Sequence, residues 1–246
     1  MKKKVFCLFS IMLLFICNSV VAQTNNVQGL KGDVNNDGSV DIADVTTLIN
    51  IILQKQNDNI PAKPIDLGLP SGLKWASYNV GATAPEEYGD YFAWGEIKKK
   101  EIYNESTYEF YKNNQFINIG TDISGTEYDV ARAKWGEKWR IPRQDEILEL
   151  INNCRSEWVT CNGINGYRFI GSNGNSIFIP ASGYYWDGDL RNDGWGGYIW
   201  SSTFYPGKVQ SDNDSAYRLM LYKDINMQSG MYSNRIFGQS VRPVTE

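Results

Sequence analysis

The chain has 246 residues, a formal net charge of −4 and no histidine. An acidic chain without a basic cluster is not expected to bind nucleic acid or anionic membranes. The absence of histidine excludes Ser-His-Asp and Cys-His catalysis and His-based zinc sites. A glycosidase needs only two carboxylates, but the acidic residues are scattered and no pair stands out. We therefore expect a protein without catalytic activity, with a carbohydrate-active enzyme as the alternative.

Residues 1–22 have the pattern of a secretory signal peptide. Positions 2–4 are lysines, residues 5–16 are apolar, and Ala22 ends a small-residue cleavage site. The apolar run is too short to span a membrane. Cleavage near Ala22 changes the net charge to −4 − 3 = −7 and predicts a secreted or cell-surface protein. Cys17 raises the alternative of a lipoprotein.

Residues 33–44 read Asp-Val-Asn-Asn-Asp-Gly-Ser-Val-Asp-Ile-Ala-Asp, which is the pattern of a calcium-binding loop. A loop of this kind supplies oxygen ligands from positions 1, 3, 5, 7, 9 and 12, with glycine at position 6 for the turn. Gly38 occupies that turn position. The sequence therefore predicts calcium as a cofactor, and the alternative is a solvated Asp/Asn turn. The predicted ligands are Asp33, Asn35, Asp37, Ser39 through its carbonyl, Asp41 through water, and Asp44.

A helix is expected directly after the loop, because apolar residues recur there at helical spacing. One loop and one helix cannot bury these residues on themselves. They must therefore pack against the rest of the chain, a second copy or another protein. We call them the apolar stripe, which consists of Val45, Leu48, Ile49, Ile52 and Leu53.

The loop ends with Asp44 instead of the usual Glu, and glycines precede it where an entering helix would be. Such a loop with one following helix resembles the calcium-binding repeat of dockerin type I modules, over residues 32–53 within a unit of residues 28–55. The resemblance implies a cohesin-like or other protein partner on the apolar stripe, chosen partly by Ile42 and Ala43. Dockerins normally carry two such repeats, and this sequence shows one. The alternative is therefore a calcium-stapled spacer.

Residues 56–64 are polar and contain two prolines, which predicts a short extended linker. Aromatic residues and glycine dominate residues 65–246. Helical periodicity appears at residues 127–135 and 144–154. Two helices followed by several antiparallel strands indicate an α+β fold. The predicted strands are 167–170 and 176–180, which form a hairpin, followed by 198–203, 216–222 and 240–244.

Five sequence blocks in this region occur in a characteristic order, at residues 66–76, 89–96, 135–142, 198–202 and 238–244. They resemble the Fibrobacter succinogenes major paralogous domain. More distantly, two of the blocks are similar to C-type-lectin-like and formylglycine-generating-enzyme folds. The resemblance implies a C-type-lectin-like domain in which the first and last strands pair and long loops project from one face. Arg143 stands where this family usually has Thr, so the following helix is expected to be less well capped.

Cys154 and Cys161 are the cysteines of the predicted mature chain. In an exported protein they either close a small disulfide loop or stay two free thiols. Both flank the end of the second predicted helix instead of lying in the late loops. The copper-cysteine chemistry of formylglycine-generating enzymes is therefore not expected here.

Residues 184–195 combine aromatic rings, glycine turns and polar side chains. Flat aromatic faces beside Asp, Asn and Arg suit stacking on sugars or extended peptides. The candidate ligand-binding residues are Tyr184, Tyr185, Trp186, Asp187, Asp189, Arg191, Asn192 and Trp195.

Other tryptophans lie in the family blocks and are expected in the core: Trp75, Trp94, Trp139 and Trp200. For Trp186 and Trp195, core and ligand surface are equally open. The sequence thus predicts an exported, non-catalytic binding or adhesion module for glycans or glycoproteins, joined to a calcium-stabilised unit. The alternative is an accessory protein of polysaccharide breakdown, tethered to an enzyme or scaffold through the dockerin-like repeat.

Overall fold

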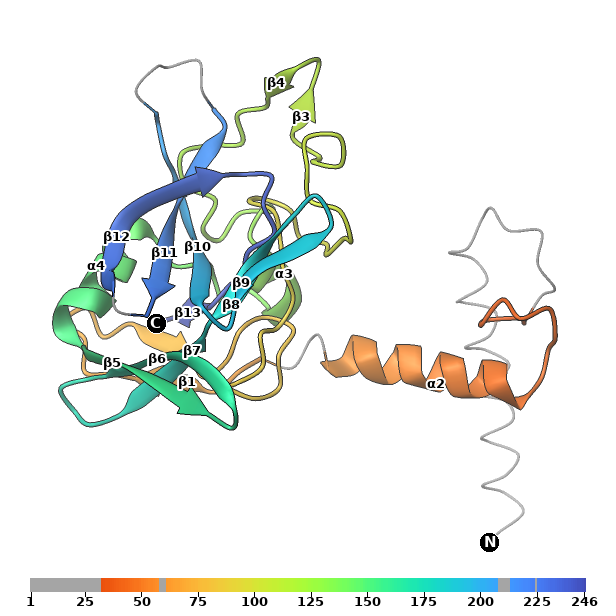
Figure 1. Ribbon diagram of the computed structural model, residues 1–246, viewed down its shortest axis with the longest axis horizontal. Helices are drawn as coiled ribbons and strands as arrows, with labels where there is room; N and C mark the ends of the chain where they lie inside the picture. The colour runs from red at the N-terminus through yellow and green to blue at the C-terminus, as the bar shows by residue number, and fades with distance from the viewer. Residues whose placement is uncertain (1–31, 58–60, 208–212, 224) are drawn as a thin grey trace, which may run out of the picture. The chain divides into compact units, whose positions relative to one another are not determined.

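A computed structural model describes residues 32–57, 61–207, 213–223 and 225–246 (Figure 1). The predicted signal peptide lies outside these residues. The chain divides into two compact units, Met1–Gln56 and Asn57–Glu246. In the part of the chain that is described, no helix is long and apolar enough to cross a membrane.

The first unit contains the acidic loop and the helix α2 (Ile42–Asn57). Asp41 precedes the helix, and its carboxylate accepts the N–H of Ala43 at 2.7 Å. Asp44 in turn accepts the backbone N–H of Asp41 at 2.8 Å. These reciprocal bonds have the geometry of a capping box, with two aspartates in place of the usual Ser or Thr and Glu. The helix expected after the loop is therefore confirmed, and two predicted metal ligands cap it.

The two ends of the second unit meet in a three-stranded sheet of β1 (Pro64–Asp66), β2 (Lys74–Ala76) and β13 (Val244–Thr245). Trp75 of β2 pairs with Ile65 on one side and with Val244 on the other, both antiparallel. The first and last strands therefore share one sheet, but the expected direct pairing between them is absent because β2 lies between β1 and β13.

The largest sheet has the strand order β12-β11-β10-β8-β9. Gly183 and Gly197 join β8 and β10 in parallel, while the other neighbours are antiparallel. Its strands are β8 (Ser182–Trp186), β9 (Asp189–Asp193), β10 (Gly196–Phe204), β11 (Ser215–Tyr222) and β12 (Ile225–Asn234).

Two smaller sheets complete the unit as described. One contains β5 (Arg155–Cys161), β6 (Ile164–Ile170) and β7 (Ser176–Pro180), and its β6–β7 pair is the predicted hairpin. The other is the short hairpin of β3 (Tyr111–Lys112) and β4 (Gln115–Phe116). The unit is a mixed α and β fold in which most strands are antiparallel.

The helix predicted at residues 127–135 is α3 (Val130–Trp135). It begins at Val130 because the buried Asp129 caps it, accepting the N–H groups of Ala131 and Arg132 at 2.9 and 3.2 Å. A capping aspartate has non-helical dihedral angles, so the helix starts after it.

Helix α4 (Gln144–Asn153) starts at the predicted residue. As expected, Arg143 provides no side-chain cap. Glu146 accepts the backbone N–H of Arg143 at 2.7 Å, and Thr203 of β10 accepts the N–H of Gln144 at 3.1 Å. Groups within and outside the helix thus take over the capping role of the absent Thr.

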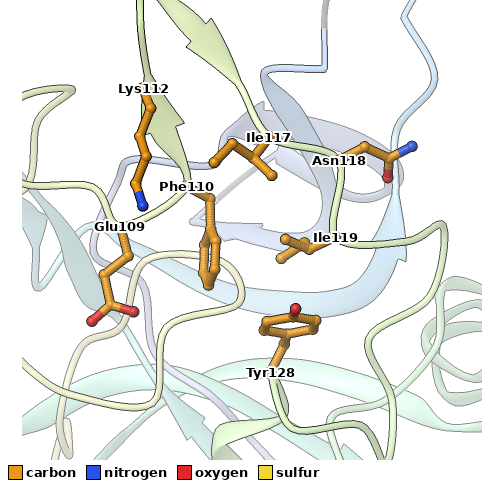
Figure 2. Close-up of a pocket in the computed structure, with 7 residues that line it drawn as sticks. All are labelled: Glu109, Phe110, Lys112, Ile117, Asn118, Ile119 and Tyr128. Carbon is orange, nitrogen blue, oxygen red and sulfur yellow. The ribbon is translucent and has the colours of Figure 1, made fainter.

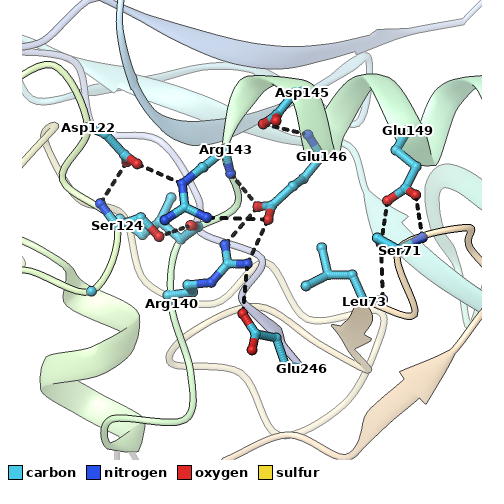
Figure 3. Close-up of polar contacts among 12 residues, drawn as sticks. Ser71, Leu73, Asp122, Ser124, Arg140, Arg143, Asp145, Glu146, Glu149 and Glu246 are labelled. Atoms are coloured by element: carbon cyan, nitrogen blue, oxygen red, sulfur yellow. Dashed lines mark hydrogen bonds and ion pairs between the residues drawn. The ribbon is translucent and has the colours of Figure 1, made fainter.

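A polar network ties α4 to its neighbours (Figure 3). Arg140 donates two parallel hydrogen bonds to Glu146, at 2.7 and 2.6 Å, and this contact raises the pKa of Arg140. Further along the helix, Glu149 accepts the N–H and the hydroxyl of Ser71, at 2.8 and 2.7 Å. Bidentate charge-assisted bonds of this kind fix orientation as well as contact.

The core contains the four tryptophans that the sequence placed there. Trp75, Trp94, Trp139 and Trp200 are 0, 1, 7 and 1% exposed. Trp75 packs in one apolar cluster with residues of α4 and β10, and the other three share a second cluster. This prediction is confirmed.

In this unit the structure decides one open alternative and corrects one prediction. Cys154, directly before β5, and Cys161, its last residue, are free thiols. The extended strand of 7 residues puts them about 20 Å apart, so a disulfide is not formed. The predicted strand 240–244 is regular only in β13. Pro243 has no N–H to donate, and Ser240 makes only an isolated bridge to Ile199.

Candidate functional site

The acidic loop folds its ligand-type side chains back onto its own backbone. Asp33 accepts the N–H groups of Asp37 and Gly38 at 3.2 and 3.0 Å. Asn35 accepts the same Asp37 N–H at 3.0 Å, and Asp37 accepts the N–H of Ser39 at 2.9 Å. These side chains are therefore directed toward one turn. Its glycine, Gly38, has a φ of 88°, which side-chain-bearing residues rarely adopt.

Asp44 closes the loop onto the helix and is only 3% exposed. One carboxylate oxygen accepts the N–H groups of Val34 and Asn35 at 2.7 and 3.3 Å, and the other accepts that of Asp41 at 2.8 Å. The bond from Asp41 is the main cause of the lowered pKa of Asp44. The last predicted ligand is thus kept ionised beside the first residues of the loop.

The chemistry of the donor set fits a hard divalent cation. The predicted ligands are carboxylate, amide and backbone oxygens, without nitrogen or sulfur, which is the set that calcium prefers. A carboxylate oxygen that accepts one N–H still has a lone pair for a cation. Within the described residues, no three acidic, histidine or cysteine side chains converge as a metal cluster. The side chains instead hydrogen-bond to the loop backbone that a bound ion would organise.

The apolar stripe on α2 is only partly covered. Val45 and Leu48 are half-buried, and Ile49 is 48% exposed. Ile42, at the start of the helix, is 76% exposed. The side chains of the remaining stripe residues, Ile52 and Leu53, lie outside the described residues.

The other candidate ligand surface is the β8–β9 hairpin, which has two aromatic faces because side chains alternate along a strand. On one face, Tyr184 and Trp186 lie 5.4 and 5.7 Å from Phe237 between ring centres. On the other, Tyr185 lies 4.8 Å from Tyr91. The structure therefore separates the tyrosines that are consecutive in the sequence.

A cationic side chain already lies over the ring of the exposed Trp186. The guanidinium of Arg191 lies 4.1 Å from its ring centre, and Asp189 contacts the same guanidinium at 3.6 Å. This arrangement brings three of the candidate ligand residues together. It also occupies a ring face that a stacked sugar would need.

Two further candidates serve the fold. Asp187 forms the hairpin turn with a φ of 51° and accepts a hydrogen bond from Asn104 at 2.8 Å. Asn192 donates to the hydroxyl of the buried Tyr198 at 2.9 Å. Both side chains therefore help to hold parts of the chain together.

Trp195 is separate from this group. It is 70% exposed but follows the far end of β9, where Asp193 pairs with Ser182. Trp186 pairs with Asp189 at the hairpin tip, so the two tryptophans are roughly 15–20 Å apart along the strands. The candidate ligand residues of 184–195 therefore do not lie on one surface.

The structure shows two hollows that sequence reasoning missed. One, of about 550 Å³, has walls of Phe110, Ile117, Ile119 and Tyr128 (Figure 2). The other, of about 430 Å³, is bordered by tyrosines of the hairpin region and by Lys99 and Lys100. The first is assembled from irregular chain around β3 and β4, where no periodic pattern or motif signals a site.

Comparison with known proteins connects the first unit to a family. No curated protein and no solved structure matches the chain. Dockerin type I domains are calcium-binding modules that attach proteins to cohesins. One family model matches a stretch of the chain that begins before the acidic loop, includes α2 and extends past the predicted linker into the segment after β1. Residues 31–68 match the family model of the dockerin type I domain.

Proposed function

We propose that this chain is an exported, tethered binding protein. Its loop and helix form a calcium-stabilised, dockerin-type attachment unit, and residues 61–246 form the non-catalytic module that the unit attaches. One observation carries the proposal. The family match covers a loop whose six predicted ligand positions hold oxygen-bearing groups. Three of them, Asp33, Asn35 and Asp37, bond to one turn, and Asp44 bonds to Val34 and Asp41 of the same loop.

Calcium would be held by the predicted set of ligands, from Asp33 to Asp44. When bound, it neutralises the carboxylates that crowd this turn and links the start of the loop to the first turn of α2. The chain itself arranges the site before calcium binds. Gly38 makes the turn, and backbone N–H groups of the loop already donate to the carboxylates of Asp33 and Asp44.

The partner would be a cohesin-like protein that contacts the start of α2. Ile42 and Ile49 support this role, because large apolar side chains with 76 and 48% exposure are suited to burial in an interface. The neighbouring stripe residues, Ile52 and Leu53, would extend the same contact by helical spacing.

The attached module would be a C-type-lectin-like domain of the Fibrobacter succinogenes major paralogous type, binding glycans or glycoproteins. The sheet that brings the two ends of this unit together, in the order β1-β2-β13, supports this assignment. The absence of histidine supports a role without catalysis. Tethering such a module to an enzyme or scaffold makes it an accessory of polysaccharide breakdown, and the signal-like residues 1–22 place it outside the cell.

Calcium binding can be tested by calorimetric titration of the chain from Gln23 to Glu246. We expect Asp33→Ala and Asp37→Ala each to weaken calcium binding by about tenfold or more. Asp145→Ala, an exposed aspartate of α4, is the matched control and is expected to bind as the parent does. Equal affinities for all four proteins would refute the calcium site.

Tethering can be tested with the same chain and purified type I cohesin domains, in calcium and after chelation. Binding is expected only in calcium, and Ile42→Asp and Ile49→Asp are expected to abolish it. Leu148→Asp is a suitable control, because Leu148 is 37% exposed but lies on α4. Binding that survives chelation, or that is lost equally in the control, would contradict the proposed role of α2.

A further inference from the structure

The hollow of about 550 Å³ in the second unit lies within the size range of small-molecule sites. Its base is apolar. Phe110 and Tyr128 meet edge to face, with ring centres 5.3 Å apart and planes at 88°. Ile117 and Ile119 lie beside the Phe110 ring (Figure 2). Ile117 is 39% exposed, so an apolar part of the wall stays open to a ligand.

The chain holds these walls in place with short-range contacts. The N–H of Ile117 donates to the carbonyl of Phe110 at 2.7 Å. Gly95 lies behind the wall, and a Cβ there would stand 2.4 Å from Ile119 and 3.3 Å from Phe110. Because only glycine leaves room for both side chains, the backbone supports them directly, and the hollow is built into the fold.

Charged groups at the edge of the hollow have no partner. The Lys112 ammonium and the Glu109 carboxylate make no ion pair or hydrogen bond among the described residues, and both are exposed. Figure 2 shows them on one side of the Phe110 ring and Asn118 on the other. Asn118 accepts the N–H of Gly120 at 2.8 Å through its oxygen, which leaves its amide hydrogens free to donate.

The other hollow differs in this respect. Its lysines are already engaged, since Lys99 contacts Asp90 at 2.9 Å and Lys100 contacts Glu96 at 2.8 Å. On the hairpin, the face of Trp186 is occupied by Arg191 at 4.1 Å. A ligand at either place would have to displace an existing contact, whereas the hollow at Phe110 offers unused ones.

The pattern of groups selects the class of ligand. A purely apolar molecule would leave Lys112 and Glu109 partly desolvated without new hydrogen bonds, which is costly. An ion of either sign gains at one of these groups and loses at the other. A neutral ring with an apolar C–H face and hydroxyls around its edge satisfies the whole set: it can rest on Phe110 and Ile117, donate to Glu109 and accept from Lys112 and Asn118.

We infer that this hollow binds a neutral sugar residue of a polysaccharide. The inference rests on the proposed binding role of the second unit and moves its glycan site from residues 184–195 to residues 109–128. The residues that orient the sugar are Glu109, Lys112 and Asn118, and the apolar contact is made by Phe110 and Ile117.

The test is calorimetric titration of the chain from Gln23 to Glu246, in calcium, with neutral gluco-, xylo- and manno-oligosaccharides of about six units and with polygalacturonate. At least one neutral oligosaccharide is expected to bind. We expect Glu109→Gln, Lys112→Ala and Ile117→Ala each to weaken that binding by about tenfold or more. Each variant removes one hydrogen bond to a charged group or one apolar contact.

The matched controls are Lys138→Ala, another exposed lysine that does not line the hollow, and Leu148→Ala, because Leu148 is 37% exposed and Ile117 is 39% exposed. Both are expected to bind as the parent does, and tryptophan fluorescence checks that all variants are folded. Binding of polygalacturonate alone, binding of none of the probes, or neutral binding that the three variants leave unchanged would each overturn the inference. Calcium and cohesin binding are read independently, so failure here is distinguishable from failure of the tethering proposal.

Discussion

Asp129 offers a sharp test of how the second unit is held together. It is fully buried, at 0% exposure. Its Oδ1 accepts the N–H groups of Ala131 and Arg132 at 2.9 and 3.2 Å. Its Oδ2 accepts those of Gly125 and Ile141 at 2.8 and 3.0 Å. One carboxylate therefore joins the turn before α3, the first turn of α3 and the strand-like segment that follows it.

The expected loss in the free energy of unfolding follows from counting these hydrogen bonds. In Asp129→Asn one oxygen becomes an NH₂ group, which faces donors and can accept nothing. In either orientation of the amide, two N–H groups lose their acceptor, one from a buried bond and one from a part-buried bond. At about 1–3 kcal/mol for the buried group and less for the part-buried one, the expected loss is about 2–4 kcal/mol. Asp129→Ala removes all four bonds and is expected to cost more. Such losses are large beside a total stability of about 5–15 kcal/mol.

Urea unfolding followed by tryptophan fluorescence is the appropriate assay. The chain has 8 tryptophans, and all of them follow residue 57, so the signal reports the second unit alone. Asp145→Asn, at an exposed position in the first turn of α4, provides the isosteric control and is expected to change stability by less than about 1 kcal/mol. If Asp129→Asn cost no more than this control, the assignment of Asp129 as the central acceptor would be wrong.

Three other predictions concern separate parts of the chain. Arg242, fully buried, donates to three acceptors at 2.8, 3.0 and 2.8 Å; Arg242→Lys cannot reproduce this planar fork and should lower the free energy of unfolding by about 2–4 kcal/mol, measured in urea. Gly171→Ala would place a Cβ 1.9 Å from the carbonyl oxygen of Leu67 and should cost about 1–3 kcal/mol. Gly174→Ala would meet no atom within 4 Å but has a φ of +84°, so its loss measures backbone strain without a packing clash. The folded pKa of Asp44 is lowered, first by the hydrogen bond from the Asp41 N–H. The ionised carboxylate therefore stabilises the fold fully above its unfolded pKa of about 3.9, and this stabilisation is lost as the pH falls through the lower folded pKa. Helix content measured by circular dichroism should drop below pH 4 in the parent, and a drop of equal size in Asp44→Asn would count against this assignment.

Much of the candidate site in the first unit follows from local sequence. The loop and its helix cap are made by residues within about a dozen positions of each other, so spacing alone predicts which side chains can meet. Asp41 and Asp44 act both as predicted ligands and as the capping pair of α2. Calcium binding itself remains a prediction that the titration decides. The partner of the apolar stripe is likewise beyond local sequence, because an interface belongs to two molecules.

In the second unit, sequence periodicity and turn residues correctly predicted α4 and the β6–β7 hairpin, because both depend on local sequence. The four buried tryptophans were predicted from their place in the family blocks. The start of α3 was missed because Asp129, inside the helical run, acts as its N-cap through Ala131 and Arg132. The sequence left the disulfide undecided, because a separation of seven positions between the two cysteines fits a loop or a strand. Only the extended strand β5 rules the disulfide out.

By itself, the sequence determined the oxygen ligands, their spacing and the periodicity of the main helices and hairpin. Tertiary structure alone decided which aromatic groups share a surface. It separated Trp186 from Trp195 and covered Trp186 with Arg191. It also brought Gly95 behind Phe110 and Ile119 to form a hollow with uncommitted charges at its edge. The physical reason is that strand register and the close approach of distant backbone segments set these contacts, and neither is written in the spacing of residues along the chain.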